Sequence, residues 1–389
     1  MSSTMLPRMA RNRWYHAPCP RGLEDVLAAE ITALGAKNVR ADRGGVRFSG
    51  SARTGYAVAL WSRVASRVLE ELARGHIQHA DGVYDLAQSV DWRRTLRPGQ
   101  TLAVRGTSNS RLVDHNHYIA LKVKDAVVDQ IRDATGSRPD VDTEAPHLPL
   151  HVHVKDTVAT IARDLAGVPL GKRGYRAGGQ HKSPLNEALA AGLLLLSGWD
   201  RTSSLADPMC GSGTILIEAA YLAADRAPGL GRTFAFESWA DRDRNGWQAL
   251  QDDANARWEA GRAQIPPLFG NDRHGGALDL ARRNVARAGL EGAIRLFEGP
   301  VDAWRPPQPP STVFTNPPYG ERLDADLPDD LQNTWYTLGR FLKDECPGAS
   351  AWILAGNPDV TRHLHLKAER RFPVWNGSIE CRLLHYRIR

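Results

Sequence analysis

The sequence is poor in cysteine and has no long apolar run. Its four cysteines form no Cys-x-x-Cys pair, so neither a zinc framework nor a disulfide framework is indicated. No apolar run approaches the roughly 20 residues that span a bilayer, and residues 1–13 lack the apolar core of a signal peptide. These absences favour a cytoplasmic protein with no metal and no membrane partner, which we expect to be a monomer. The cysteines are Cys19, Cys210, Cys346 and Cys381.

Positive charge is concentrated near the N-terminus. The formal net charge is +6, and residues 1–80 carry twelve Lys and Arg side chains against six Asp and Glu, which equals the whole excess. Such asymmetry favours a polyanionic partner that is reached through the N-terminal part of the chain. The alternative is an ordinary solvated face on a basic protein. Charge alone leaves both interpretations open.

A turn with two glycines at residues 205–214 indicates the cofactor. The run Leu-Ala-Asp-Pro-Met-Cys-Gly-Ser-Gly-Thr is typical of a strand end, a tight turn and a helix start, and the glycines let the backbone approach a ligand. A dinucleotide site would have a third glycine, and a P-loop would end in Gly-Lys-Ser or Gly-Lys-Thr. An acidic residue ahead of the turn suits a cationic cofactor with an amino group, which points to S-adenosylmethionine. The candidate cofactor-binding residues here are Asp207, Met209, Cys210, Gly211, Gly213 and Thr214.

Residues 315–320 contain the candidate catalytic residues. Two prolines after an asparagine and before a tyrosine form a stiff turn, because each proline fixes φ and neither donates a backbone N–H. We expect the carbonyls of this turn to be free, at the end of a buried strand formed by residues 312–314. An amide oxygen, a carbonyl and an aromatic ring suit a planar base that is held by its exocyclic amine. An ordinary surface turn would look like Asn-Gly or Pro-Asp-Gly instead. The candidate catalytic residues are Asn316, Pro317, Pro318 and Tyr319.

The two motifs together resemble those of a known family. Asp-Pro-Met-Cys-Gly-Ser-Gly-Thr at 207–214 and Asn-Pro-Pro-Tyr-Gly-Glu-Arg-Leu at 316–323 are similar to the THUMP-domain RNA guanine-N2 methyltransferases, above all to the ribosomal RNA large subunit methyltransferase L type. Related bifunctional enzymes carry a second methyltransferase domain after the first. Because this chain stops at Arg389, we expect that second activity to be absent. Further shared segments lie at 170–176, 183–190, 236–239 and 281–285.

The resemblance implies an α/β fold with three domains. We expect a Rossmann-like S-adenosylmethionine-dependent methyltransferase domain, preceded by an α+β ferredoxin-like plus THUMP RNA-binding region. The expected bounds are 1–61 for the N-terminal ferredoxin-like domain, 62–166 for the THUMP domain and 167–389 for the methyltransferase domain.

Local patterns predict individual elements of these domains. Apolar spacing predicts a helix from Leu23 to Leu34 that ends at Gly35. Residues 151–154 and 158–161 are typical of paired strands. Residues 381–386 are expected to complete the catalytic sheet as its antiparallel edge strand.

Two acidic residues complete the cofactor site that the resemblance implies. Asp272 follows the second strand of the catalytic domain, where a carboxylate accepts hydrogen bonds from both ribose hydroxyls. Its distance from the glycine turn exceeds the usual spacing, and the insertion at 228–261 explains the excess. Asp302 is the candidate for binding the adenine amino group, although the family has Gly-Asp directly after the third strand. Glu298 is the alternative for that role.

Basic residues in two segments are candidates for RNA contacts. Residues 105–111 combine small side chains with two arginines, and residues 172–176 form a basic linker broken by a glycine. The linker has two further interpretations, as a contact to the cofactor and as a solubilising connection. The candidate RNA-binding residues are Arg105, Arg111, Lys172, Arg173 and Arg176.

The predicted reaction is direct methyl transfer to guanine N2, most of all in 23S ribosomal RNA. The flipped base would stack on Tyr319 while its amine donates to the Asn316 amide oxygen and the Pro317 carbonyl, and no general base is required. Three alternatives stay open: a tRNA guanine-N2 methyltransferase, an adenine-N6 nucleic-acid methyltransferase, and a ribosome-assembly factor that binds RNA without catalysis. The THUMP-like region favours RNA, and the Gly-Glu-Arg-Leu continuation favours guanine.

Overall fold

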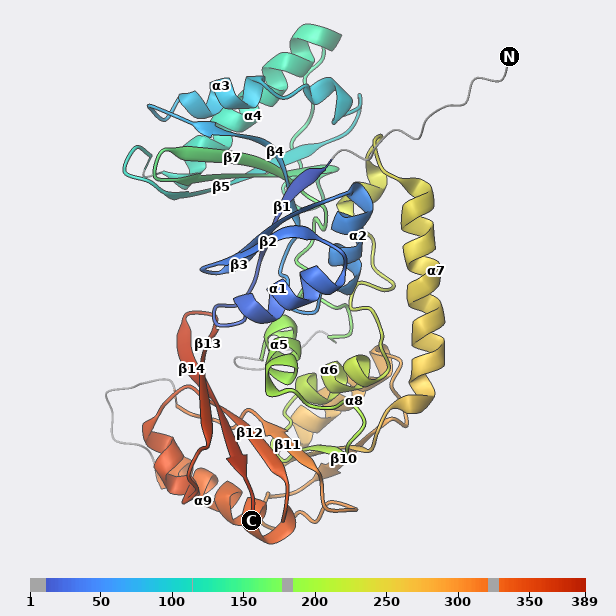
Figure 1. Ribbon diagram of the computed structural model, residues 1–389, viewed down its shortest axis with the longest axis vertical. Coiled ribbons are helices and arrows are strands. Elements are labelled where there is room, and N and C mark those ends of the chain that lie inside the picture. Colours follow the sequence, from blue (N-terminus) through green and yellow to red (C-terminus); the bar gives the residue numbers. More distant parts are fainter. Residues whose placement is uncertain (1–11, 114, 177–184, 321–328) are drawn as a thin grey trace. The chain divides into compact units, whose positions relative to one another are not determined.

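The computed structural model describes residues 12–113, 115–176, 185–320 and 329–389, which form two compact units (Figure 1). The first unit contains the described chain up to Pro18, Ala28–Leu170 and Gly231–Leu250. The second contains Cys19–Leu27, the described parts of Gly171–Leu230, and those of Gln251–Arg389. The contiguous domain bounds stay a prediction, because each unit is assembled from separate stretches of the chain.

A seven-stranded sheet forms the first unit, in the order β2-β3-β1-β4-β7-β6-β5. Neighbouring strands run antiparallel except β5 and β6, which are parallel. The predicted pairing of residues 151–154 with 158–161 is confirmed as β6 against β7. The strands are β1 (Arg13–Pro18), β2 (Lys37–Asp42), β3 (Gly45–Gly50), β4 (Leu69–His76), β5 (Leu102–Asn109), β6 (Leu148–Lys155) and β7 (Val158–Asp164).

The helices near the N-terminus follow local sequence signals. The predicted helix at 23–34 is confirmed as α1 (Glu24–Ala33), and Gly35 follows it with a φ of +82°, a conformation that glycine adopts readily. A capping box begins α2 (Ala52–Trp61), because the Ser51 hydroxyl accepts from the Thr54 amide at 3.2 Å. The next helices along the chain are α3 (Gly82–Gln88), the 3-10 turn η1 (Trp92–Arg94) and α4 (Asn116–Thr135), and α3 and α4 lie together in Figure 1.

The segment Gly231–Leu250 packs into the first unit, although the sequence placed it inside the catalytic domain. It contains the 3-10 turn η2 (Ala235–Ser238) and the start of α7 (Arg244–Gly261). The Phe236 ring stacks on Tyr56 with 4.1 Å between centroids. The Arg163 guanidinium lies over Trp239 and pairs with Asp241 at 2.7 Å. Aromatic packing and an ion pair to the buried Arg163 therefore hold this insertion in the first unit.

The sheet of the second unit also has seven strands, in the order β10-β9-β8-β11-β12-β14-β13. The first five in this order are parallel, and β14 runs antiparallel to β12. The prediction that residues 381–386 form an antiparallel strand is confirmed, but their place at the edge is wrong, because β13 covers β14. The strands are β8 (Leu205–Asp207), β9 (Leu268–Asp272), β10 (Ile294–Glu298), β11 (Thr312–Thr315), β12 (Ser350–Ala355), β13 (Arg370–Asn376) and β14 (Ile379–Arg387).

Helices cover both faces of this second sheet. α6 (Thr214–Ala223) and α8 (Gly275–Arg287) pack on one face, with α5 (Glu187–Ser197) against α6. On the other face, Trp335 and Phe341 of α9 (Asp329–Glu345) join a core with Val313 and Ile353 of the sheet. The two neighbours of β8 are β9 and β11, so the strand order reverses there, and a crevice opens at the carboxyl ends of such strands. Two further 3-10 turns, η3 (Arg262–Gln264) and η4 (Asp359–Leu364), complete the unit.

In the part of the chain that the structure describes, no helix is both long enough and apolar enough to cross a membrane.

Candidate active site

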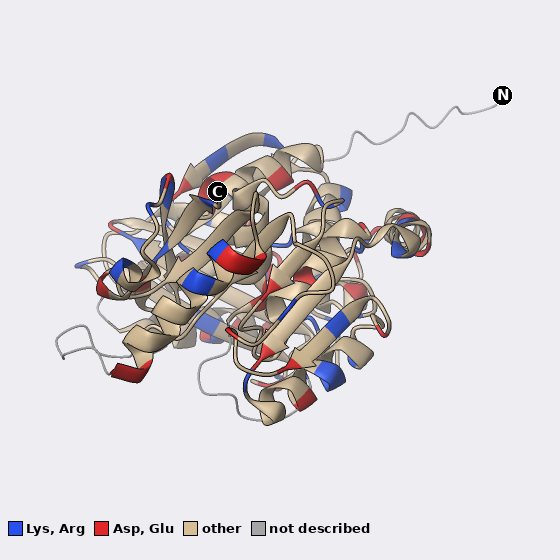
Figure 2. Cartoon of the chain, turned by 90° about the horizontal axis from the view of Figure 1, so that it is seen from below, with Lys and Arg blue, Asp and Glu red and all other residues tan. Residues whose placement is uncertain are grey.

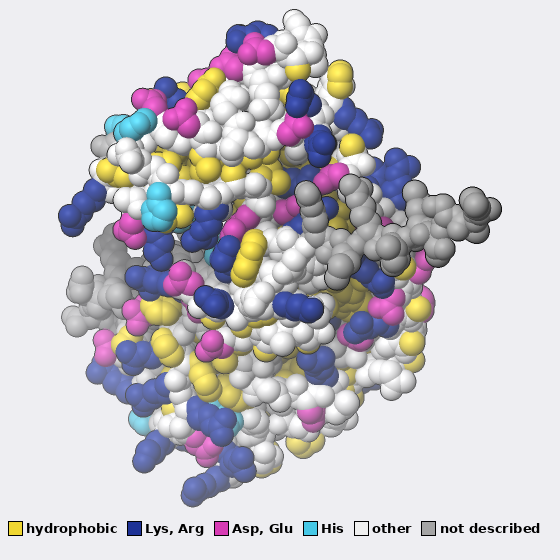
Figure 3. All heavy atoms as spheres, turned by 45° about the horizontal axis from the view of Figure 1, so that its top comes forward, with side chains coloured by type: hydrophobic (Ala, Val, Ile, Leu, Met, Phe, Trp, Pro, Cys, Tyr) yellow, Lys and Arg dark blue, Asp and Glu magenta, His cyan; other side chains and the backbone are white. Residues whose placement is uncertain are grey.

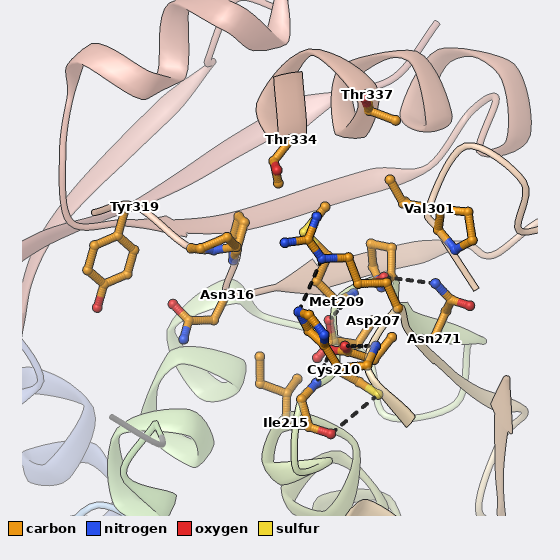
Figure 4. A pocket seen from close by; sticks show the side chains of 18 of the residues that line it. Asp207, Met209, Cys210, Ile215, Asn271, Val301, Asn316, Tyr319, Thr334 and Thr337 are labelled. Atoms are coloured by element: carbon orange, nitrogen blue, oxygen red, sulfur yellow. Dashed lines mark hydrogen bonds between the residues drawn. The ribbon is translucent and has the colours of Figure 1, made fainter. Parts of the chain in front are cut away.

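A cavity of about 840 Å³ lies at the carboxyl ends of the central strands of the second unit. Its walls come from the turn after β8, the loops after β9 and β10, the Asn-Pro-Pro-Tyr turn after β11, and one face of α9. In Figure 4, Asn316 and Tyr319 lie at one side of the cavity, and Thr334 and Thr337 project from the helix that borders it above. Both sequence motifs therefore face one space, although about a hundred residues separate them along the chain.

The glycine turn has the backbone conformation that its sequence predicts. Gly211 has a φ of +52°, and Gly213 has a φ of +79° and caps the N-terminus of α6. The Gly211 amide donates to Asp272 Oδ2 at 2.8 Å, and the Cys210 amide donates to the Asn271 carbonyl at 2.9 Å. These bonds join the turn to the end of β9. The ends of β8 and β9 thus form one continuous wall of the cavity.

Asp207 is a buried carboxyl at the bottom of this wall. It is 1% exposed, and its Oδ1 accepts from the Thr315 hydroxyl at 2.7 Å and from the Met209 amide at 3.2 Å. Burial raises the pKa of Asp207 to about 7, although the two hydrogen bonds oppose the rise. The carboxyl therefore titrates near neutral pH, where a nearby cation would favour its ionised form.

Asp272 presents both carboxylate oxygens at the end of β9. Oδ2 accepts from the Gly211 amide, and Oδ1 accepts from the His274 amide at 3.0 Å. Each carboxylate oxygen has a further lone pair, so the group can still accept bonds from a ligand. The side chain of Asn271 donates to the Pro208 and Gly299 carbonyls, which holds the loops after β8 and β10 together.

Asp302 and Glu298 are the two candidates for binding the adenine amino group, and of these Asp302 lines the cavity. It is exposed and lies in the loop after β10. Glu298 is oriented toward the start of α8, where a β-carbon added at Gly275 would lie 3.0 Å from its carboxylate. The geometry favours Asp302 over Glu298.

The Asn-Pro-Pro-Tyr turn carries an unused acceptor. Asn316 Oδ1 is buried, and no donor among the described residues bonds to it. The expectation that all carbonyls of the turn are free is wrong at Pro318, because its oxygen accepts from Trp335 Nε1 at 2.8 Å. That bond ties the turn to α9 and fixes its orientation. A buried acceptor without a partner is rare in folded proteins and indicates a place for a ligand donor.

The Tyr319 ring is held from two sides. A β-carbon added at Gly356 would lie 2.4 Å from the ring, so the ring packs directly on the chain after β12. The Tyr319 hydroxyl accepts from Asn376 Nδ2 at 3.3 Å, and burial raises its pKa. The ring therefore has a defined position beside the cavity that it lines. The residues after this turn, including Glu321, Arg322 and Leu323, lie outside the described residues.

The basic linker at 172–176 is mostly an internal structure. The Arg173 side chain is 1% exposed and lies 3.6 Å from the Glu218 carboxylate, to which Tyr175 donates at 3.0 Å. Arg176 pairs with Glu187 at 2.7 Å. Burial of Arg173 is at odds with the prediction that it contacts RNA, because contact would require it to leave this ion pair. Lys172, in contrast, is exposed.

Arg105 and Arg111 are exposed in the first unit, but Arg105 belongs to a strand. β5 extends to Asn109 and forms the edge of the sheet. Some of the basic side chains near the N-terminus form ion pairs within the protein, for example Arg47 with Glu71 at 2.8 Å. Lys and Arg are interspersed with Asp and Glu along the chain in Figure 2, and they are scattered over the face seen in Figure 3. Charge alone therefore outlines no single RNA path.

Several residues at the cavity or directly behind it were not predicted from the sequence. Thr315 directly precedes the Asn-Pro-Pro-Tyr turn, but its hydroxyl bonds to Asp207, which lies 108 residues earlier in the chain, so no local signal pointed to this contact. Ile379 and the residues of α9 likewise had no local signal, because their approach depends on how β14 and α9 pack. Among the missed residues, Asn271, Asn333, Thr334, Thr337 and Ile379 line the cavity, and Thr315 is buried behind it.

Three models of protein families match the chain. Residues 15–69 match an RlmL ferredoxin-like domain, and residues 78–164 match a THUMP domain. Residues 173–385, more than half of the chain, match an RMKL-like methyltransferase domain. The order of these matches agrees with the expected order of the fold.

Known proteins match along most of the chain. A ribosomal RNA large subunit methyltransferase K/L of Syntrophotalea carbinolica is 39% identical over 386 residues, which are 96% of this chain and 53% of that protein. The chain spans about half the length of the curated relatives it matches. A putative methyltransferase solved in complex with SAH is 26% identical, with a TM-score of 0.86 over 98% of this chain and 99% of that one. A structure described as a predicted N6-adenine-specific DNA methylase from Listeria monocytogenes is also 26% identical, with a TM-score of 0.86 over 97% of each chain.

Proposed function

The chain belongs to the family of RMKL-like methyltransferases, and from this membership we propose that it methylates the exocyclic N2 of a guanine in 23S ribosomal RNA. The observation that carries the proposal is the unpartnered Asn316 Oδ1 in the cavity that also contains the glycine turn. An acceptor in this position suits an amine that is brought to the cofactor.

The cofactor is S-adenosylmethionine, and the residues at the cavity fit it. A buried carboxyl at Asp207 suits the cationic end of the cofactor, because ionisation near neutral pH gives it a charge partner. Asp272 has oxygen lone pairs for the ribose hydroxyls. Apart from Gly211 and its two chain neighbours, no described residue has an atom within 4 Å of a β-carbon built at Gly211, so the turn has open space beside its backbone. The assignments of Asp207, Asp272 and Asp302 to these roles are proposals, supported by their place at one cavity.

Asn316 and Pro317 direct the reacting amine. Bound S-adenosylmethionine supplies an electrophilic methyl group on a sulfonium. The guanine amine donates to Asn316 Oδ1 and to the Pro317 carbonyl, and these two bonds turn its lone pair toward that methyl group. The Tyr319 ring, held by Asn376 and Gly356, provides a flat surface for the flipped base. Methyl transfer from the sulfonium to this nitrogen would release one amine proton to water, because neither the Asn316 amide oxygen nor the Pro317 carbonyl is basic enough to keep it.

RNA is the proposed partner. The match to a THUMP domain at 78–164 supports RNA as the substrate, and the names of the relatives support ribosomal RNA over tRNA. We propose Arg105, Arg111 and Lys172 as contacts, since all three are exposed. Guanine over adenine is supported by the resemblance of residues 316–323, and action in the cytoplasm by the nature of the substrate.

Nucleoside mass spectrometry tests this function. Purified protein, methyl-labelled S-adenosylmethionine and unmodified transcripts of 23S ribosomal RNA or tRNA should yield label as N2-methylguanosine in the 23S transcript. Label in tRNA would show that tRNA is the substrate and not 23S ribosomal RNA. Label only as N6-methyladenine would overturn the guanine assignment.

Asn316→Ala should reduce the rate by about 10²–10³-fold, because it removes the acceptor that aligns the amine. The control Asn333→Ala removes an amide from the same cavity on α9 and should leave most of the activity. Full activity of Asn316→Ala with intact RNA binding would support the non-catalytic assembly factor instead.

A further inference from the structure

Exposed apolar side chains of the second unit gather at the cavity. In the described part of this unit, the exposed large hydrophobic side chains are Tyr336 (46% exposed) and Ile379 (38%). A single exposed hydrophobic side chain needs no explanation. Ile379 lines the cavity, and Tyr336 lies on α9, the helix whose Asn333, Thr334 and Thr337 also line it. Residues three apart on a helix are surface neighbours, so Tyr336 lies next to Asn333, at the edge of the part of α9 that lines the cavity.

The Tyr336 ring is oriented by a tight contact between α9 and η4. At Gly339 the two elements come so close that an added β-carbon would lie 2.3 Å from the Leu364 carbonyl oxygen. The chain then turns at His365, which has a φ of +50° and donates its amide to the Arg362 carbonyl at 3.3 Å. As a result, the rings of Tyr336 and His365 meet edge to face, with centroids 5.8 Å apart and planes at 87°. The tyrosine is thus held in place but remains half exposed.

An oriented, exposed aromatic ring suits a nucleic-acid base. Every base has a π-face, so stacking on such a ring requires no particular sequence. Single-stranded RNA exposes bases that can be splayed onto aromatic side chains, as is necessary when one base is flipped into a pocket. Arg362 and Lys367 flank His365 in the sequence and are exposed, which puts positive charge near the ring pair for the phosphates. Together, these features match a nucleotide next to the flipped one.

We propose that Tyr336, oriented by His365, stacks on a base adjacent to the methylated nucleotide in single-stranded RNA. The inference rests on the proposed function, since it places the neighbouring nucleotide at the mouth of the same cavity. It assigns a second aromatic contact, separate from Tyr319, which receives the flipped base. Tyr336 acts on the binding of RNA and has no part in cofactor binding.

Three variants test the proposal through steady-state kinetics with transcribed 23S ribosomal RNA and methyl-labelled S-adenosylmethionine. Tyr336→Ala should raise the KM for RNA by about 5- to 100-fold, the range that corresponds to loss of one stacked base. Tyr336→Phe keeps the ring and should behave as the wild type. His365→Asn removes the orienting ring but tolerates the left-handed backbone, and should give an intermediate rise. In all three, the affinity for S-adenosylmethionine should stay unchanged.

Other results would overturn the inference. An unchanged KM in Tyr336→Ala would exclude stacking, and an equal loss in Tyr336→Phe would assign the effect to the hydroxyl. A parallel loss of cofactor affinity would mean that the substitution only disturbs the cavity. If the wild type itself methylates no ribosomal RNA, the proposed substrate fails. The stacking surface is then tested separately by fluorescence anisotropy with a labelled oligouridine 12-mer, where equal affinities of the wild type and Tyr336→Ala would overturn it.

Discussion

Replacement of Asp207 by asparagine should change how the free energy of unfolding of the cofactor-free protein depends on pH. The carboxyl is 1% exposed, and burial raises its pKa to about 7 from an ordinary value of 3.8. A carboxyl whose pKa is raised on folding opposes folding at higher pH, because the unfolded chain then releases the proton more readily. This contribution to stability is complete below about pH 4, is lost as the pH rises toward 7, and stays lost above pH 7.

The pKa shift sets the size of the effect. About three pKa units correspond to about 4 kcal/mol of stability that is lost above pH 7. Asparagine does not titrate, and its oxygen still accepts from the Thr315 hydroxyl and the Met209 amide. Its buried NH₂ group costs about 1–3 kcal/mol where no acceptor faces it. We therefore expect Asp207→Asn to be about 1–3 kcal/mol more stable than the wild type at pH 8 and about 1–3 kcal/mol less stable near pH 4.

Urea unfolding of the cofactor-free protein at several pH values measures this crossover. Hydrogen exchange of peptides from β8 and β11 identifies the transition that belongs to the second unit. The control Asp302→Asn changes an exposed carboxyl at the same cavity and should stay within about 0.5 kcal/mol of the wild type. A stability difference between Asp207→Asn and the wild type that does not change with pH would refute the reasoning, as would a less stable variant at pH 8.

Three further predictions concern binding and packing. The affinity of the wild type for S-adenosylmethionine should rise by up to about tenfold per pH unit below pH 7 and then level off, because the cation prefers ionised Asp207; calorimetry that finds no pH dependence would contradict this pairing. Gly356→Ala places a β-carbon 2.4 Å from the Tyr319 ring and should slow methyl transfer about tenfold or more with unchanged cofactor affinity, whereas wild-type kinetics would show that the ring position is unimportant. Arg173→Met should lower the urea stability by about 3–5 kcal/mol by breaking a buried ion pair, while Lys172→Met should weaken RNA binding without loss of stability; the reverse pattern would restore Arg173 as an RNA contact.

Much of the fold followed from local patterns. The helix at 23–34, the strands at 151–154 and 158–161, and the strand that precedes residue 316 are all confirmed. In each case the signal, either the spacing of apolar side chains or a glycine at the end, lies within the element or directly beside it. The family and the order of its domains were also correctly recognised from the two motifs and the segments between them.

The errors share a physical cause. The strand at 381–386 was placed at the sheet edge because nothing in its own residues shows that β13 covers it. Arg173 was predicted to contact RNA because it lies in a basic linker, yet its side chain is buried and pairs with Glu218, which lies 45 residues further along the chain. Burial and strand order depend on residues far away in the sequence, so local patterns do not contain them.

The sequence by itself determined the two local motifs of the candidate site, which are a glycine turn after an acidic residue and an asparagine followed by two prolines. Both are properties of consecutive residues, since φ restriction and missing N–H groups act locally. Only the tertiary structure decided that the Thr315 hydroxyl faces Asp207, that α9 and Ile379 enclose the cavity, and that Gly231–Leu250 packs into the other unit. These contacts join separate segments, and they exist only once the apolar faces of sheet and helices have been buried together.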